Sequence, residues 1–224
     1  MRMSRASVRR SAISFDPHAN RLMKLNSILD LPALYKLFST LVGAQNSQST
    51  FVREYVRPAK GARILDIGCG PGNILDHLPQ VDYFGFDFNP SYIESATKRY
   101  GDRGQFFCQR VSEAQVFLEQ PESFDIVLAI GILHHLDDAE ALQLFEIAKR
   151  ALKKGGRLVT FDGCYVDDQS RMAKYLLSRD RGQFVRDEKG YVDLAKARFD
   201  EVHASTRSDL LNIPYTHIML ECVK

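Results

Sequence analysis

The chain has 224 residues, of which 45% are hydrophobic and 26% are charged, which is enough for one full α/β core. Its 30 basic and 28 acidic residues nearly balance at a net charge of +2, so no whole-chain field that would draw in nucleic acid is expected. No apolar run reaches about 18 residues, so no transmembrane helix is predicted. The four cysteines lack metal-type spacing, which indicates reduced thiols in a cytoplasmic protein.

The N-terminal end differs in composition from the rest of the chain. Residues 1–14 hold four arginines, several serines and no acid. We expect a flexible basic tail over residues 1–20, with a transit peptide or a membrane-surface arm as the alternative for this segment.

Apolar side chains at helical spacing come after this tail. They predict helices over residues 22–42 and a further helix over 47–57, which together would form an N-terminal cap spanning 21–60. The last of these helices would bury one face made of Phe51, Val52, Tyr55 and Val56.

Strands and helices alternate from residue 62 onward, within a single domain that spans residues 21–224. Such alternation predicts a parallel sheet with helices on both faces, in the α/β class. The expected strands cover 62–67, 82–87, 105–110, 124–130, 156–162, 199–206 and 214–223. The expected helices cover 72–78, 90–100, 112–119, 138–152, 168–179 and 190–198.

The first of these strands leads into a glycine-rich loop. The apolar run around Asp66 reads as a buried strand, and glycines follow at positions 68, 70 and 72. A dinucleotide loop would place its third glycine at position 73, which is Asn73. A diphosphate prefers bare N–H groups without a neighbouring carboxylate, so this loop suits a cationic ligand better than an anionic one.

At these residues the chain resembles the class I S-adenosylmethionine (SAM)-dependent methyltransferases of the small-molecule or saccharide type. Four segments match the family's motifs in order: 64–72, 84–87, 123–136 and 152–159. The resemblance implies a three-layer α/β/α Rossmann-like fold with a seven-stranded, mostly parallel sheet and an antiparallel last strand. It also implies SAM as the cofactor, S-adenosylhomocysteine as its product, and methyl transfer as the activity.

The resemblance further implies a set of cofactor-binding residues: Asp66, Gly68, Cys69, Gly70, Asp87, Phe88, Val111 and Ile130. Two carboxylate oxygens on Asp87 can hold both ribose hydroxyls, although Asp87 could instead cap the next helix. The third strand departs from the family because Arg110 lies where an acid often accepts from the adenine amino group. Either the Gln109 carbonyl takes that role or the backbone at Val111 reads the adenine.

The acceptor side is expected at the ends of the fourth and fifth strands. Methyl transfer is an in-line displacement that positioning alone can largely promote, and a hydroxyl acceptor also benefits from a base. The candidate catalytic residues are His134, His135 and Asp162, each of which could instead have a structural or capping role. The candidate substrate residues are Tyr165, Arg179, Tyr215 and His217, and a helical insertion over 163–198 would help to wall the site. We expect no metal.

The sequence after the fourth strand narrows the acceptor class. Methyltransferases that act on exocyclic amines of nucleic acids carry an Asn/Asp-Pro-Pro-aromatic clamp there, whereas this chain has the sequence IGIL over 130–133. We therefore expect a small-molecule, saccharide or lipid-intermediate acceptor and no nucleic acid. A nicotinamide-dependent oxidoreductase and a non-catalytic SAM-binding protein are the alternatives, and a homodimer is left open.

Overall fold

The computed structural model describes residues 43–110, 121–179 and 182–224. The described residues all belong to a single compact unit. The predicted tail, the helices predicted over 22–42 and 112–119, and Val111 lie outside the described residues.

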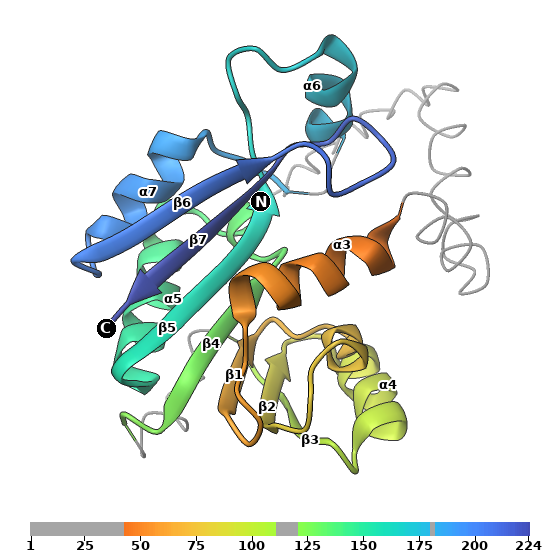
Figure 1. Cartoon of the computed structure of the whole chain (residues 1–224), viewed down its shortest axis with the longest axis vertical. Helices are drawn as coiled ribbons and strands as arrows, with labels where there is room; N and C mark the ends of the chain where they lie inside the picture. The colour runs from red at the N-terminus through yellow and green to blue at the C-terminus, as the bar shows by residue number, and fades with distance from the viewer. Residues whose placement is uncertain (1–42, 111–120, 180–181) are drawn as a thin grey trace, which may run out of the picture. The chain divides into compact units, whose positions relative to one another are not determined.

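The described elements alternate in type along the chain, as expected (Figure 1). In order they are α3 (Ala44–Phe51), the π-helical turn η1 (Val52–Val56), β1 (Arg63–Ile67), the 3₁₀ turn η2 (Asn73–Asp76), β2 (Asp82–Asp87), α4 (Pro90–Tyr100), β3 (Gly104–Cys108), β4 (Phe124–Ile130), the 3₁₀ turn η4 (Leu133–His135), α5 (Asp138–Ala151), β5 (Leu152–Gly163), α6 (Arg171–Ser178), α7 (Glu188–Lys196), β6 (Glu201–Arg207) and β7 (His217–Val223).

Seven strands form one sheet in the order β3-β2-β1-β4-β5-β7-β6. Strands β1 to β5 pair in parallel, while β7 runs antiparallel to both of its neighbours, β5 and β6. This arrangement confirms the predicted fold class, including the antiparallel last strand. The chain order reverses between β1 and β4, and ligands of open α/β sheets bind beyond the carboxyl ends of the strands at such a point.

Two apolar clusters sandwich the sheet. One contains side chains of α5 and α7, such as Phe145 and Tyr191, and the other contains side chains of α3, η1, η2 and α4, such as Phe51 and Tyr100. In Figure 1, α3 lies in front of the sheet, while α5 and α7 lie behind it. The four residues predicted to form a buried helix face, Phe51, Val52, Tyr55 and Val56, are all buried.

Several element boundaries differ from those predicted. The helix predicted over 72–78 is only the four-residue turn η2, because Gly72 precedes it in the left-handed conformation and Pro79 follows closely. The helix predicted over 47–57 changes to a π-helical turn after Phe51. Strand β5 begins at Leu152 instead of residue 156. The pairing of β4 with β5 has a register irregularity, and this lets the Gly155–Gly156 turn belong to the strand.

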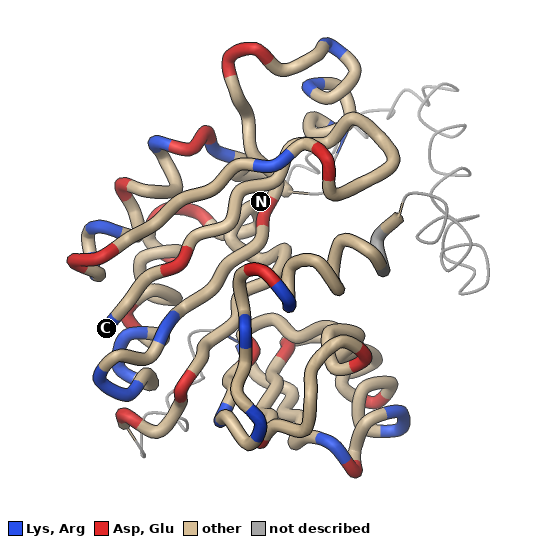
Figure 2. The backbone as a smooth tube through the Cα atoms, viewed as in Figure 1, with Lys and Arg blue, Asp and Glu red and all other residues tan. Residues whose placement is uncertain are grey.

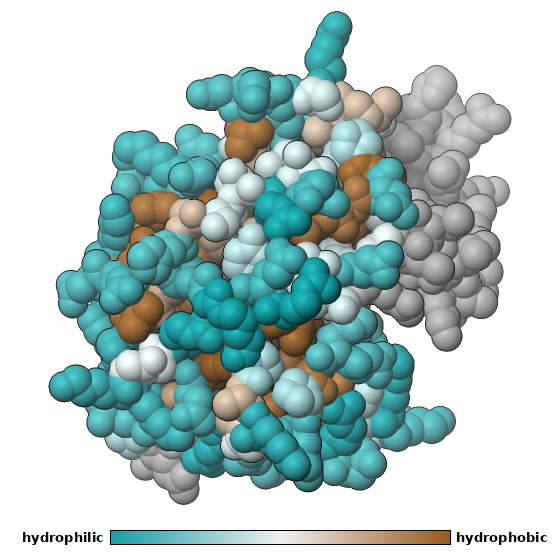
Figure 3. All heavy atoms as spheres, in the orientation of Figure 1, coloured by the Kyte–Doolittle hydropathy of each residue, from teal (hydrophilic) through white to brown (hydrophobic). Residues whose placement is uncertain are grey.

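Charged residues of both signs are interspersed along the described chain (Figure 2). Hydrophilic residues cover most of the face seen in Figure 3, with smaller apolar areas between them. Among the described helices, none is both long and apolar enough to cross a membrane.

Candidate cofactor and acceptor site

Backbone N–H groups of the loop between β1 and η2 already donate hydrogen bonds within the protein. Gly68 and Cys69 both donate to the Phe86 carbonyl oxygen, at 2.8 and 3.0 Å, and Gly70 donates to Asp87 Oδ2 at 3.0 Å. Gly72 donates to the Cys69 carbonyl oxygen at 3.0 Å, and Pro71 has no N–H group. The loop therefore offers no row of bare amides of the kind that holds a diphosphate.

The loop glycines differ in what surrounds them. Gly68, Gly70 and Gly72 all have positive φ, at 75°, 53° and 75°. A Cβ atom on Gly68 would lie 2.6 Å from Ile132 Cδ1, and one on Gly72 would lie 3.3 Å from the Tyr100 ring. A Cβ atom on Gly70 would meet no described atom within 4 Å. The first and third glycines thus serve packing, whereas the Gly70 backbone borders open space that a ligand can use.

Asp66 lies inside the core, and only one of its two carboxylate oxygens accepts a hydrogen bond from a described residue. It is 1% exposed, and its Oδ2 accepts a hydrogen bond from Tyr83 Oη at 2.6 Å. Its Oδ1 is buried and accepts no hydrogen bond within the described part of the chain. Burial raises the pKa of Asp66 to about 7, opposed by the Tyr83 hydrogen bond. A buried oxygen of this kind is an acceptor site for a cationic N–H donor.

Asp87 is held in place at the end of β2. Besides the Gly70 amide, it accepts a hydrogen bond from the Asn89 amide at 2.8 Å, and it is 8% exposed. The cap of α4 is Asn89, whose side chain accepts from the Ser91 amide at 3.0 Å. Because the capping role belongs to Asn89, the Asp87 carboxylate oxygens keep lone pairs for other donors.

The end of β3 adds two further groups beside Asp87. Gln109 donates its backbone N–H to the Asp87 carbonyl oxygen at 3.0 Å, and its side-chain Oε1 is buried without a hydrogen bond from any described residue. Phe88 is 67% exposed, with the Arg110 guanidinium carbon 5.8 Å from its ring centre. A hydrogen-bond acceptor and an exposed ring therefore border the end of β2.

On the other side of β1, strand β4 ends at Ile130. The chain then turns at Gly131, whose φ is 65° and whose amide donates to the Phe161 carbonyl oxygen of β5 at 2.7 Å. The carboxyl ends of β1, β2, β4 and β5 consequently lie along one edge of the sheet, and they bring the loop glycines, Asp87 and Ile130 to that edge.

Of the two adjacent histidines, His134 is the one joined to Asp162. His134 Nδ1 lies 2.8 Å from Asp162 Oδ1, and the His134 backbone N–H donates to the same oxygen at 3.3 Å. Both residues are buried, and Asp162 Oδ2 has no hydrogen bond to any described group. His135 is exposed, with its ring centre 4.2 Å from that of His134. The Asp162 side chain thus binds His134 instead of capping the segment after β5.

Rings from α3, β5, β7 and the segment that precedes β7 lie on the α3 side of β5. The Phe161 and His217 rings stack at 4.5 Å and 14°, Tyr215 lies 4.7 Å from His217, and Phe51 of α3 lies 5.0 Å from Phe161. Because strand side chains alternate, Phe161 and Asp162 point to opposite faces of the sheet. The sheet edge thus has an aromatic side and a His–Asp side.

Sequence comparison identifies a domain within the chain. Residues 65–158 match a family described as a methyltransferase domain. The chain contains a class I SAM-dependent methyltransferase domain. The matched segment includes the loop glycines, Asp87, Ile130 and His134.

Curated relatives of this methyltransferase domain include ubiquinone biosynthesis O-methyltransferases. The one from Azorhizobium caulinodans is 33% identical over 113 residues, which cover 50% of this chain and 41% of the relative. The one from Chelativorans sp. is 31% identical over 102 residues, which cover 45% of this chain and 40% of the relative. The matched part thus spans less than half the length of these relatives.

Solved structures show the same fold at low identity. Haemonchus contortus phosphoethanolamine N-methyltransferase 2, in complex with S-adenosyl-L-methionine, aligns with a TM-score of 0.62 and 18% identity, over 79% of this chain and 52% of that chain. Streptomyces coelicolor geranyl diphosphate C-methyltransferase aligns with a TM-score of 0.60 and 13% identity, over 79% of this chain and 75% of that chain.

The remaining substrate residues predicted from the sequence are Arg179 and Tyr165. Arg179 is exposed after α6, with its guanidinium carbon 5.3 Å from the Tyr175 ring centre. Tyr165 is half-buried, and its amide donates to the Arg186 carbonyl oxygen at 3.1 Å. In the described ranges, no group of three His, Cys, Asp or Glu side chains could hold a metal ion.

Two contributors to the site of this methyltransferase domain were missed in the sequence. Tyr83 binds Asp66 from the neighbouring strand, and Gly85, which pairs with Asp66, leaves room for that ring because a Cβ atom there would lie 2.9 Å from Tyr83 Cε1. Phe161 stacks on His217 across β5 and β7. The available sequence signal for the contact between Tyr83 and Asp66 was a tyrosine two residues before a glycine in the second strand.

Proposed function

We propose that this chain binds SAM at the edge formed by β1, β2 and β4 and transfers its methyl group to a hydroxyl of a small-molecule, saccharide or lipid-intermediate acceptor. The observation that carries the proposal is the β1–η2 loop, whose amides donate within the protein while the buried Asp66 Oδ1 beside it accepts from no described residue. SAM carries an ammonium and a sulfonium and no phosphate, which matches this loop. The same loop disfavours the nicotinamide-dependent alternative.

The proposed roles follow from the groups present. Asp66 Oδ1 would accept from the ammonium, directly or through water, and the open side of Gly70 would take the methionine part. Asp87, already oriented by two amides, would hold the ribose hydroxyls. Gln109 Oε1 would accept from the adenine amino group beside Phe88. Gly68, Cys69 and Ile130 would line the cofactor with backbone atoms.

A hydroxyl acceptor is supported by the His134–Asp162 pair. An ionised carboxylate only accepts hydrogen bonds, so His134 Nδ1 carries the proton toward Asp162 and Nε2 becomes the basic nitrogen. A bound SAM supplies an electrophilic methyl group, and the chain's task is to align the acceptor oxygen and to remove its proton as the new bond forms. The relatives' name, O-methyltransferase, points to the same class of acceptor atom.

Gly70→Ala tests the cofactor half of this proposal. The new Cβ meets no described atom but would occupy the ligand's space, so we expect SAM affinity measured by calorimetry to fall by at least about tenfold. Gly61→Ala is the matched control, because Gly61 also has positive φ and open surroundings. Both variants should lose about 1–2 kcal/mol of stability from left-handed strain. Equal SAM affinity in the two variants contradicts the proposal.

Labelled SAM tests the transfer half. The wild-type chain is incubated with methyl-labelled SAM and a metabolite extract, and labelled products are identified by mass spectrometry. We expect a labelled methyl ether, which is lost in Gly70→Ala and much reduced in His134→Gln, since glutamine cannot accept the proton. Label on a nitrogen or carbon would overturn the hydroxyl assignment, and no label in any product would favour a non-catalytic SAM-binding protein.

A further inference from the structure

Residues 182–187, which we call the strap, cross the turn that carries His134. The Phe184 amide donates to the His134 carbonyl oxygen at 2.9 Å. Gly182 lies against the His134 ring so closely that a Cβ atom there would be 2.2 Å from His134 Cδ2. The strap therefore contacts both the backbone and the ring of His134, and only glycine fits at position 182.

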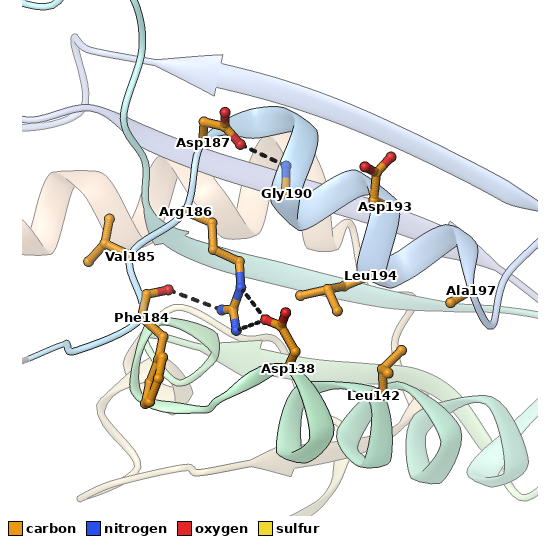
Figure 4. A pocket seen from close by; sticks show the side chains of 10 residues that line it. All are labelled: Asp138, Leu142, Phe184, Val185, Arg186, Asp187, Gly190, Asp193, Leu194 and Ala197. Carbon is orange, nitrogen blue, oxygen red and sulfur yellow. Dashed lines mark hydrogen bonds and ion pairs between the residues drawn. The ribbon is translucent and has the colours of Figure 1, made fainter.

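Arg186 of the strap binds the backbone on both sides of His134. Its Nη1 donates to the Leu133 carbonyl oxygen at 3.0 Å, and its Nη2 donates to the Leu136 carbonyl oxygen at 2.8 Å. Its Nε and Nη2 both donate to Asp138 Oδ1, at 3.1 and 2.7 Å, and Nη1 also donates to the Phe184 carbonyl oxygen at 3.0 Å. Figure 4 shows the guanidinium between Phe184 and Asp138, at the edge of a groove of about 650 Å³ between α5 and α7.

These bonds matter because η4 is a weak element. Its two internal bonds, from the His135 amide to Ile132 and from the Leu136 amide to Leu133, span 2.9 and 3.2 Å. A 3₁₀ turn of three residues has little stability of its own, so its position is set by whatever holds it. The planar, five-donor fork of arginine is suited to fix several carbonyl groups at once.

We infer that Arg186 is a positioning residue for methyl transfer. It holds η4 so that His134 Nδ1 stays on Asp162, and it thereby decides which ring nitrogen of His134 is basic. The inference rests on the proposed function, in which His134 is the base. Arg186 acts through η4, because its side chain is 11% exposed and bonded to η4, the strap and α5.

A purely structural arginine supplies the matched control. Arg157 donates to the carbonyl oxygens of Tyr55 and Val56, at 3.1 and 2.8 Å, and to Glu221 Oε2 at 2.8 Å. It thus makes the same kinds of bonds as Arg186, to the π-helical turn η1 instead of η4. Removing either side chain should lower stability, but only the loss of Arg186 should alter His134.

The test measures the His134 tautomer in the full chain by NMR, with ¹⁵N-labelled histidine and His134→Gln to assign the signal. In the wild type we expect the Nδ1–H form alone. In Arg186→Lys and Arg186→Met we expect a mixture of tautomers, and in Arg157→Met the wild-type form. An unchanged His134 signal in both Arg186 variants would overturn the inference, as would the same mixture in Arg157→Met.

Gly182→Ala keeps the inference testable if the Arg186 variants unfold. The added methyl should displace the His134 ring and produce the tautomer mixture with Arg186 intact, while an unchanged His134 signal would count against the strap's role. Calorimetry with SAM on the same samples separates this result from the proposed function. A chain that binds no SAM but loses the Nδ1–H form in Arg186→Met would contradict the function and leave the positioning intact.

Discussion

At the scale of single residues, Asp66 couples the candidate site to stability. An unfolded aspartate has a pKa of about 3.9, whereas burial raises the pKa of Asp66 to about 7 in the fold. Between these values the folded chain keeps a proton that the unfolded chain has lost. The free energy of unfolding therefore falls, through this group, as pH rises from about 4 to about 7, and it levels off above that range.

Asp66→Asn should remove this part of the pH dependence. Relative to about pH 4.5, wild type should lose a few kcal/mol more than the variant by about pH 8, because each pKa unit corresponds to about 1.4 kcal/mol. The measurement is urea unfolding followed by circular dichroism, since the chain has no tryptophan. Asp102→Asn, at an exposed carboxyl, is the control and should follow wild type. Parallel curves for wild type and Asp66→Asn would refute the assignment.

The sequence predicted some residue roles, and tertiary contacts decided the others. The choice between Asn89 and Asp87 as the cap of α4 depends on local geometry, and Pro90 already pointed to the helix start. The choice between His134 and His135 as the candidate base depends on which of them contacts Asp162, which lies 28 residues after His134 in the chain. No local pattern encodes that meeting, or the bond between Tyr83 and Asp66.

At the scale of elements, the predictions succeeded where strong start and stop signals flank a run. Strands β2 and β4 and helix α4 have the predicted bounds. The predictions were less accurate where two patterns compete, as in η2, where apolar spacing favoured a helix but the left-handed Gly72 and the nearby Pro79 leave room for one turn. Helix α6 begins at Arg171, directly after its Ser170 cap and three residues later than predicted.

The capping box that starts α5 offers a test at this scale. Asp137 accepts from the Glu140 amide at 2.9 Å, and the Glu140 side chain accepts from the Asp137 amide at 3.3 Å. Asp137→Ala should lower the free energy of unfolding by about 1 kcal/mol. Glu140→Gln should stay within a few tenths of a kcal/mol of wild type, because glutamine can complete the box. Equal losses in the two variants, measured by urea unfolding, would speak against the cap.

At the scale of the whole molecule, the sheet order brings distant segments to one edge. Alternating strands and helices, together with the resemblance, were sufficient to predict the parallel sheet and the antiparallel β7. The acceptor side was harder to predict because it combines η4, the end of β5 and the strap, which are separated by tens of residues. Those contacts depend on loop packing and not on periodicity.

The most direct test concerns the charge of the ligand that rests on the β1–η2 loop. The wild-type chain is titrated by calorimetry with SAM, with NAD and with NADP, each alone and then in competition. We expect saturable binding of SAM near one molecule per chain, and neither binding nor competition from the dinucleotides. Displacement of SAM by either dinucleotide, or dinucleotide binding where millimolar SAM releases no heat, would contradict the proposed cofactor site.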